Sequence, residues 1–161
     1  MGEVGAGNDR LPVLVFYNGK VLVDPVLSEI WEALGMRTRI EVDSSDVVVV
    51  GAGPAGLASA VYASSEGLDT LVLEPAVPGG QAGTSSMIRN YLGFQRGISG
   101  DDLANRAVEQ AWLFGTRFVL SQKVVGLDMV GPMKRVRTDD GTEVTARAVV
   151  IACGVTWRRL A

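Results

Sequence analysis

The spacing of apolar and polar residues changes along this chain, and each change predicts an element of secondary structure. Near the N-terminus, two apolar runs, residues 12–17 and 20–23, flank Asn18-Gly19. This dipeptide is typical of hairpin turns because both residues tolerate positive φ. Asp24-Pro25 then has the pattern of a helix N-cap and first helical residue, and apolar residues share one helical face up to Gly35. We therefore predict a β-hairpin and a helix within residues 11–35. A polar linker over 36–45 follows, in which RIEV is compatible with an extended strand.

Residues 46–74 have the pattern of a β-α-β unit. The run DVVVV is typical of a buried parallel strand because it is continuously β-branched. A helix of mostly small residues is predicted over 54–66, ending at Gly67, and DTLVLE is the second strand. The next stretch, 75–98, is rich in Gly, Ser and Pro. Connections of that length without their own structure are usually functional or disordered.

The rest of the chain changes from a helical pattern to a β pattern. Ser99 and Asp102 are spaced like a capping box at the start of a helix that ends at Gly115. The segments RFVL, KVVGLDMV, MKRVRT and EVTA follow as strands, with turns at Gly131-Pro132 and Asp140-Gly141, and AVVIACG is the final strand. The predicted fold class is α/β: a Rossmann-type parallel sheet, a β-meander at about 117–146 and an N-terminal hairpin–helix.

Composition narrows the function mainly through what is absent. The 161 residues carry a net charge of −3, no histidine and one cysteine, Cys153. The charge balance gives no reason to expect nucleic acid or a membrane as a partner. A His-based triad, an internal disulfide and a C-x-x-C redox pair are excluded within this sequence. No apolar run approaches the ~20 residues of a membrane helix, and no secretory signal is recognisable, so we expect a cytoplasmic location.

The stretch VVVVGAGPAGLASAVY carries the clearest binding motif. It contains G-x-G-x-x-G as Gly51, Gly53 and Gly56, between a predicted strand and a predicted helix. The first glycine allows a tight turn, the second lets the backbone approach a pyrophosphate, and the third lets the helix pack on the sheet. The helix start offers N–H groups and a positive dipole end to phosphates. Glu74, at the end of the next strand, predicts hydrogen bonds to ribose hydroxyls and disfavours a 2′-phosphate, hence NADP, at this site.

These residues leave the class of protein open. An NAD-binding dehydrogenase domain and a non-catalytic nucleotide-binding or partner-docking module both fit a β-α-β unit with a ribose-binding acid. No residue has the features of a catalytic acid, base or nucleophile. In an enzyme of this kind, the cofactor therefore carries the chemistry, and the protein supplies binding and orientation.

Three segments resemble the FAD-binding part of the thioredoxin reductase-like flavoproteins, class II of the pyridine nucleotide-disulfide oxidoreductases. They are DVVVVGAGPAGLASAVYASSEGLDTLVLE, PGGQAGTSSMIRNYLGF and AVVIACG, in the family's order. The resemblance covers about residues 44–160 and implies FAD as cofactor, with electrons passing from NADPH to FAD to an acceptor in a full-length enzyme. The cofactor-binding residues that it implies are Gly51, Gly53, Pro54, Ala55, Gly56, Glu74, Gly80, Gln81, Asn90, Val124, Ala152 and Gly154.

The resemblance also implies roles for the later residues of this set. Gly80 and Gln81 match positions along the pyrophosphate and ribityl chain, and Asn90 matches an asparagine that reaches the flavin. Val124 matches a residue whose backbone contacts adenine. The segment 152–154 matches the family's Ala-Thr-Gly, with Cys153 in place of Thr. We expect this cysteine to be a small buried apolar residue without a redox role.

Three parts of the family's enzymes are not recognisable in this sequence: an NADPH domain with its own glycine motif, a redox cysteine pair, and the C-terminal return of the FAD domain. We therefore predict an N-terminal appendage and linker at 1–43 and an incomplete FAD-binding domain at 44–161, with NADPH bound only through a missing domain. Whether the chain is truncated, a split gene product or a degenerate relative stays open. By itself it should lack NADPH-dependent activity, hold FAD weakly and form homo-oligomers.

Residues 11–35 are similar to the last hairpin and helix of a thioredoxin-like domain. In that comparison Pro12 corresponds to the cis-proline that precedes the first strand of the hairpin. The alternative is a generic hairpin–helix unit, which is common in unrelated folds. If the similarity holds, the chain begins partway through a larger polypeptide.

Overall fold

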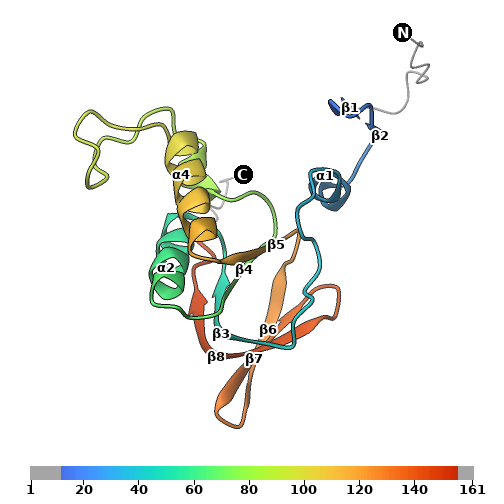
Figure 1. The fold of residues 1–161 in the computed structure, drawn as a ribbon, viewed down its shortest axis with the longest axis vertical. Helices are drawn as coiled ribbons and strands as arrows, with labels where there is room; N and C mark the ends of the chain where they lie inside the picture. The colour runs from blue at the N-terminus through green and yellow to red at the C-terminus, as the bar shows by residue number, and fades with distance from the viewer. Residues whose placement is uncertain (1–11, 156–161) are drawn as a thin grey trace, which may run out of the picture.

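A computed structural model describes residues 12–155, which form a six-stranded sheet with helices on one face and a separate two-stranded hairpin (Figure 1). No helix in this range is long and apolar enough to cross a membrane. The strands are β1 (Val13–Val15), β2 (Val21–Val23), β3 (Ser44–Val50), β4 (Thr70–Glu74), β5 (Arg117–Leu120), β6 (Val124–Val130), β7 (Met133–Thr138) and β8 (Glu143–Ile151). The helices are α1 (Leu27–Ala33), α2 (Pro54–Ser65), α3 (Gly80–Gly83) and α4 (Gly100–Leu113).

The large sheet has the strand order β5-β4-β3-β8-β7-β6. Strands β5, β4, β3 and β8 are mutually parallel, whereas β7 and β6 continue the sheet as an antiparallel pair. The long strand β8 joins the two parts, because its first residues pair with β7 and its later residues pair with β3. This arrangement confirms the predicted α/β class, with a parallel Rossmann-type sheet and a meander.

Two details of the predicted strands are wrong. The meander was expected at about 117–146, but β5 pairs in parallel with β4 and so belongs to the Rossmann part. The helix α4 before β5 provides the crossover that two neighbouring parallel strands require. The segments EVTA and AVVIACG were expected as separate strands, yet they form the single strand β8 up to Ile151. The meander proper is β6-β7-β8.

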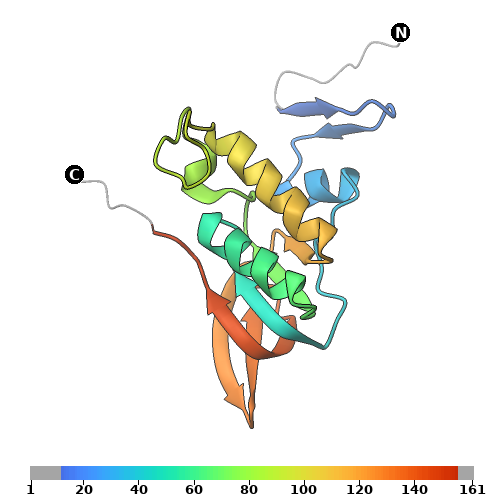
Figure 2. The same cartoon turned by 60° about the vertical axis from the view of Figure 1, so that its left-hand side comes forward.

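The two faces of the parallel sheet are covered differently. Helices α2 and α4 lie together over one face (Figure 2), where Val47 and Val49 pack in a core with Leu57 and Phe118. Because side chains alternate along a strand, Val48 and its alternate neighbours point to the opposite face. That face packs in a second core with Val136 and Val144 of the meander, and Ile40 and Val42 of the linker after α1 lie against this core. The RIEV stretch is not a strand, but its apolar side chains close this core.

Capping residues explain where the long helices begin and end. The Ser99 hydroxyl accepts a hydrogen bond from the N–H of Asp102 at 3.1 Å, which confirms the predicted cap of α4. Helix α2 ends at Ser65 with Glu66 as its C-cap, and Gly67, the next residue, adopts a φ of 79°, as expected for a helix-terminating glycine.

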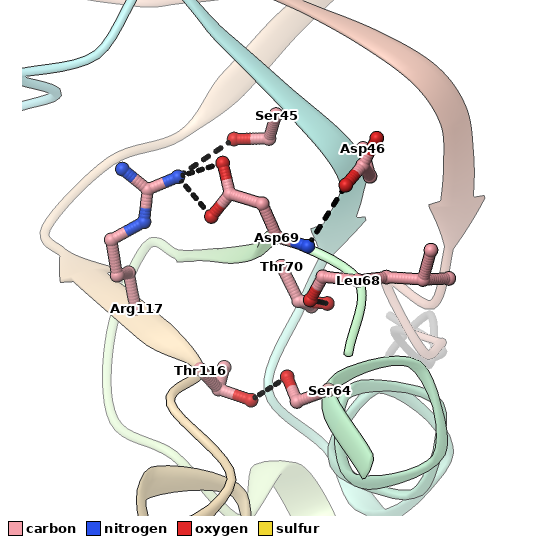
Figure 3. A network of polar contacts seen from close by, with 8 residues as sticks. All are labelled: Ser45, Asp46, Ser64, Leu68, Asp69, Thr70, Thr116 and Arg117. Atoms are coloured by element: carbon pink, nitrogen blue, oxygen red, sulfur yellow. Dashed lines mark hydrogen bonds and ion pairs between the residues drawn. The ribbon is translucent and has the colours of Figure 1, made fainter. Parts of the chain in front are cut away.

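The amino ends of the parallel strands are held by side chains (Figure 3). Arg117 on β5 contacts the Asp69 carboxylate at 2.6 Å, and the N–H of Asp69 donates to Asp46 at 3.1 Å. That backbone hydrogen bond, together with Arg147, lowers the pKa of Asp46 below its usual value. This network ties the start of β5 to the starts of β3 and β4.

The N-terminal unit forms as a hairpin and a helix, with different boundaries. Val15 pairs with Val21, so the loop between the strands is longer than the Asn18-Gly19 dipeptide, and only Gly19 has positive φ. Helix α1 starts at Leu27 and not at Pro25. Asp24 adopts a φ of 49° as the chain leaves the hairpin. The Glu29 carboxylate then accepts a hydrogen bond from the N–H of Val26, the N-cap, at 3.0 Å.

Residues 75–98 are more ordered than a structureless connection. They contain the short helix α3 and an isolated antiparallel bridge between Ile88 and Ile98. The bridge closes an excursion that projects beyond the start of α4 (Figure 1). Near the other end of the stretch, the Trp31 indole N–H donates to the carbonyl of Ala76 at 3.2 Å, so α1 is attached to this connection.

Candidate functional site: a cavity at the carboxyl ends of the parallel strands

A cavity of about 630 Å³ opens where β3, β4 and β8 end, next to the start of α2. This is the edge at which open α/β sheets bind their ligands. Ten of the twelve residues predicted as cofactor-binding line the cavity; the exceptions are Gly56 and Asn90. The lining residues are Val50, Gly51, Gly53, Pro54, Ala55, Glu74, Pro75, Gly80, Gln81, Ala82, Lys123, Val124, Ala152, Cys153, Gly154 and Val155.

At two of the three motif glycines, Gly51 and Gly56, a side chain would clash with nearby backbone atoms. Gly51 has a φ of 100°, and a Cβ there would lie 2.5 Å from the carbonyl oxygen of Ala152. A Cβ on Gly56 would lie 1.9 Å from the carbonyl oxygen of Gly51, so only glycine lets α2 start this close to the turn after β3. Gly56 is buried beneath the cavity and is not part of its lining.

Gly53 differs from both of these glycines. Its φ is −73°, which any residue adopts, and a Cβ there would meet nothing within 4 Å. The space in front of it is the cavity itself. The first intrahelical hydrogen bond runs from Leu57 N–H to the carbonyl of Gly53 at 2.9 Å, so the N–H groups of Ala55 and Gly56 have no partner within the helix. This helix start therefore has N–H groups free to donate to an anion in the cavity.

Glu74 occupies the end of β4, and its side chain holds the glycine turn. One carboxylate oxygen accepts a hydrogen bond from Ala52 N–H at 2.7 Å, and the other accepts one from Ala76 N–H at 2.9 Å. The residue is 7% exposed and still lines the cavity. Each carboxylate oxygen has a further lone pair for a hydroxyl donor. The carboxylate therefore links β4 to the turn, a structural role that the sequence pattern did not indicate.

The segment around α3 forms one wall. Gly79 N–H donates to the carbonyl of Ala52 at 2.7 Å, which ties this wall to the glycine turn. A Cβ on Gly80 would lie 3.2 Å from Cα of Gly53, so the two backbones pass in close contact. The Gln81 amide donates to the carbonyl of Val155, on the strand-end side of the cavity.

The opposite wall comes from the end of β8 and the start of β6. Ala152 N–H donates to the carbonyl of Val50 at 2.8 Å, and Gly154 turns the chain with a φ of 68°. Val124 is half-buried at the start of β6. Cys153 is exposed to the cavity, so the prediction of a buried apolar cysteine is wrong. It lies beyond the last paired residue of β8, where the neighbouring strands no longer cover side chains.

Asn90 is the predicted residue that the structure leaves away from the cavity. It is exposed in the excursion between α3 and α4, close to the bridge that joins Ile88 and Ile98. Its role in cofactor binding stays a prediction.

Six lining residues were not predicted as cofactor-binding: Val50, Pro75, Ala82, Lys123, Cys153 and Val155. All six lie beside predicted positions, among them Pro75 and Lys123. Pro75 directly follows Glu74, and Lys123 directly precedes Val124. Both could have been found as neighbours of predicted positions at strand ends, because residues at the carboxyl ends of parallel strands share one edge. Neither belongs to a residue pattern that indicates binding.

The arrangement suits an elongated nucleotide more than a catalytic reaction of its own. Backbone groups dominate one side, Glu74 offers acceptors for hydroxyl groups, and Lys123 supplies a positive charge. Among residues 12–155, no cluster of His, Cys, Asp or Glu could hold a metal ion.

Comparison with known proteins defines the class of this domain. Residues 45–161 match the family model of the pyridine nucleotide-disulphide oxidoreductases, and the chain belongs to that family. Within the family, it is a thioredoxin reductase-like flavoprotein domain. It is 37% identical to the thioredoxin reductase of Bacillus subtilis over 115 residues, which are 71% of this chain and 35% of the relative. It is 39% identical to the bifunctional thioredoxin reductase/thioredoxin of Mycobacterium leprae, over 71% of this chain and 25% of that protein.

Solved structures give the same family. The thioredoxin reductase of Streptococcus pyogenes aligns with a TM-score of 0.68 at 33% identity, over 73% of this chain and 38% of the other. That of Gloeobacter violaceus aligns with a TM-score of 0.65 at 37% identity, over 73% and 37%. The chain thus spans between a quarter and two fifths of the length of these proteins.

Proposed function

We propose that this chain binds FAD and forms the first part of the FAD-binding domain of a thioredoxin reductase-like oxidoreductase. In the complete enzyme, electrons would pass from NADPH through FAD to an acceptor. When bound, the flavin supplies the redox chemistry. The residues of this chain hold the ADP half, with the pyrophosphate at Gly53 and the start of α2 and the ribose at Glu74.

The main support for this proposal is that ten residues predicted to bind one dinucleotide line a single cavity. These residues lie up to about 100 positions apart in the sequence. The free space in front of Gly53 supports close approach of a pyrophosphate, because nothing in the protein fills it. The buried Glu74 carboxylate supports a ribose with free hydroxyls and disfavours a 2′-phosphate.

Titration with nucleotides tests the proposal directly. Added FAD should bind the purified chain weakly, which a change in flavin fluorescence on titration measures, and mass analysis of an extract of the complex should recover FAD. Binding of NAD without FAD would instead favour a dehydrogenase domain. Binding of neither would favour a partner-docking module and contradict the proposal.

Gly53 gives the sharpest variant. Gly53→Val places a side chain in the space assigned to the pyrophosphate, and the φ of −73° accepts it without strain. We expect a folded protein whose FAD affinity falls at least about a hundredfold, with Gly53→Ala intermediate. Circular dichroism and thermal unfolding check the fold. A folded Gly53→Val protein with the affinity of the parent would contradict the phosphate assignment.

The division of the chain is also part of the proposal. Residues 44–161 are assigned to FAD binding and residues 1–43 to an N-terminal hairpin–helix appendage and a linker, of which Ile40 and Val42 complete a core of the domain. The NADPH site and the redox partner are assigned to parts of the complete enzyme outside these 161 residues. An assay with NADPH, added FAD and a dye acceptor should therefore give no turnover above the FAD-only control.

A further inference from the structure

One buried residue holds three segments of the chain together beside the cavity. Gln122 lies on the crossing from β5 to β6 and is 5% exposed. Its side-chain amide donates to the carbonyl of Thr38 at 2.8 Å and to the Asp140 carboxylate at 3.1 Å. Its backbone N–H donates to the carbonyl of Glu74 at 3.2 Å. Gln122 therefore connects the linker after α1 and the turn between β7 and β8 to the end of β4.

These contacts lie beside the two cavity residues that are expected to hold the adenosine. Glu74 is assigned to the ribose, and Val124, whose backbone is expected to contact adenine, lies two residues after Gln122. Both of them line the cavity, whereas Gln122 does not. An effect of Gln122 on a bound nucleotide must therefore pass through the residues whose positions it fixes.

The chain needs support here because it turns just before Gln122. Ser121 adopts a φ of 57°, in the left-handed region that is unfavourable for residues other than glycine. On one side of this turn, Leu120 N–H donates to the carbonyl of Arg37 at 2.9 Å. On the other side lies the hydrogen bond from Gln122 to Glu74. A strained residue of this kind persists only where its surroundings fix it, and the anchored side chain of Gln122 provides part of that fixation.

The Gln122 amide also leaves one of its own atoms unsatisfied. Its side-chain oxygen is buried without a hydrogen-bond partner among residues 12–155. Burying an unpaired acceptor costs stability, which offsets part of what the two donated hydrogen bonds contribute. An apolar side chain would avoid this cost, but it could not hold the linker carbonyl and the Asp140 carboxylate. The residue type therefore fits a role in fixing positions better than a role in stability alone.

We propose that Gln122 is a positioning residue, which holds the end of β4 so that the Glu74 carboxylate is placed to recognise ribose hydroxyls. This inference rests on the nucleotide site proposed above and adds a residue outside the glycine motif. Glu74 is held at two points, by two backbone N–H groups on its carboxylate and by Gln122 N–H on its carbonyl. Loss of the Gln122 amide should loosen the ribose end of the cavity and leave the start of α2, at Gly53, unchanged.

Calorimetric titration of ADP and 2′-deoxy-ADP into the full chain tests this role, because the two nucleotides differ by one ribose hydroxyl. We expect the parent to bind ADP about tenfold more tightly than 2′-deoxy-ADP. Gln122→Met keeps the side-chain length and removes both donated hydrogen bonds. In this variant, ADP affinity should fall about five- to tenfold, and 2′-deoxy-ADP affinity should change by less than about twofold. The preference for ADP should therefore nearly disappear.

Ser64→Ala is the matched control for lost stability. It removes a buried hydrogen bond of 2.6 Å with Thr116, at the opposite end of the parallel strands. A variant that is merely less stable should keep the parent's preference for ADP, and we expect this result for Ser64→Ala. Circular dichroism and the unfolding midpoint compare the fold and the stability of both variants.

A second variant covers a loss of folding. Gln122→Met should stay folded, because Asp140 keeps its hydrogen bonds from Thr138 and Thr142. If it does not fold, Gln122→Asn decides, since it keeps a buried amide on a shorter side chain that cannot reach both partners of Gln122. The same loss of preference for ADP is expected in that variant.

Two results would overturn the inference: a folded variant at Gln122 that keeps the parent's preference for ADP, or equal losses of affinity for the two nucleotides. The first would leave Gln122 with a role in stability alone, and the second would mean that the whole cavity has changed. Equal binding of ADP and 2′-deoxy-ADP by the parent would also overturn it, together with the ribose assignment of Glu74, while the pyrophosphate site would stand. If the parent binds neither FAD nor ADP, the proposed function fails and this inference fails with it.

Discussion

The two ends of the parallel strands use hydrogen-bonding groups in opposite ways. At the amino ends, side chains satisfy one another across β3, β4 and β5, as in the contact of Arg117 with Asp69 (Figure 3). At the carboxyl ends, the contacts come mostly from the backbone, and Gly53 leaves open space. One end is closed by protein groups, and the other keeps donors and space for a ligand.

This difference shows how one sheet can be stable and still leave a place for a ligand to bind. Side chains that pair with one another lock the strand starts and leave nothing to recognise a ligand. Glycines remove side chains at the other end, so the rigidity there has to come from close backbone contacts and from Glu74. Substitutions at the carboxyl end should therefore affect binding, and also folding where they disturb a close backbone contact or remove Glu74, whereas substitutions at the amino end should affect folding alone.

The largest effect is expected for Gly56→Ala. The added Cβ would lie 1.9 Å from the carbonyl oxygen of Gly51, a backbone atom that cannot move without displacing the start of α2. We expect a loss of at least about 4 kcal/mol in the free energy of unfolding. Gly53→Ala is the control, because it adds the same atom where nothing lies within 4 Å. Chemical denaturation of both proteins measures the difference, and equal stabilities would show that the helix start is not so tightly packed.

Glu74→Ala should affect folding and binding together. It leaves the N–H groups of Ala52 and Ala76 without their acceptor, which we expect to lower the free energy of unfolding by about 2–4 kcal/mol. In the protein that remains folded, FAD affinity should fall about ten- to a hundredfold. Glu109→Ala, on the exposed side of α4, should change neither. A stable Glu74→Ala protein that binds FAD like the parent would contradict both roles.

Ser64→Ala tests the amino end. The hydroxyl groups of Ser64 and Thr116 share a buried hydrogen bond of 2.6 Å between α2 and the start of β5. Removing one partner should lower the free energy of unfolding by about 1–2 kcal/mol and leave nucleotide affinity within twofold. The double variant Ser64→Ala/Thr116→Val should recover part of this loss, because no hydroxyl is left unpaired. A clear loss of nucleotide affinity in folded Ser64→Ala protein would contradict the claim that the amino ends of the strands contribute to folding and not to binding.

The smallest effect is expected for Asp140, which contributes to stability only at acidic pH. Hydrogen bonds from the Thr138 hydroxyl and the Thr142 N–H lower the pKa of Asp140 from 3.8 to about 2. The folded protein therefore keeps this carboxylate ionised where the unfolded chain binds a proton. The resulting stabilisation is complete above about pH 4 and disappears as the pH falls towards 2. Asp140→Asn should flatten the dependence of the unfolding midpoint on pH in that window only; an unchanged profile would contradict the assignment.

The sequence predicted the parts whose pattern is local and strong. The glycine motif, Glu74 and the Ser99 cap follow from short-range geometry, and all lie where expected. Membership of β5 in the parallel sheet could not be predicted from its four residues, because pairing depends on a crossover and not on the strand itself. Lys123 was not predicted to line the cavity, because a single charged residue at the start of a strand belongs to no recognisable binding motif. The second role of Glu74, in holding the turn, needed the positions of two backbone N–H groups.

The pairing of β3 with β8 bears on the order in which this domain folds. Val47 pairs with Ala148, so the central strand stays unpaired on one side until about 100 further residues have been synthesised. Contacts this distant in sequence slow folding, because a long loop must close before they form. During translation, β3, β4 and β5 can associate early, with an apolar edge open beside Val48. A nascent chain at that stage offers an edge to chaperones or to other nascent chains.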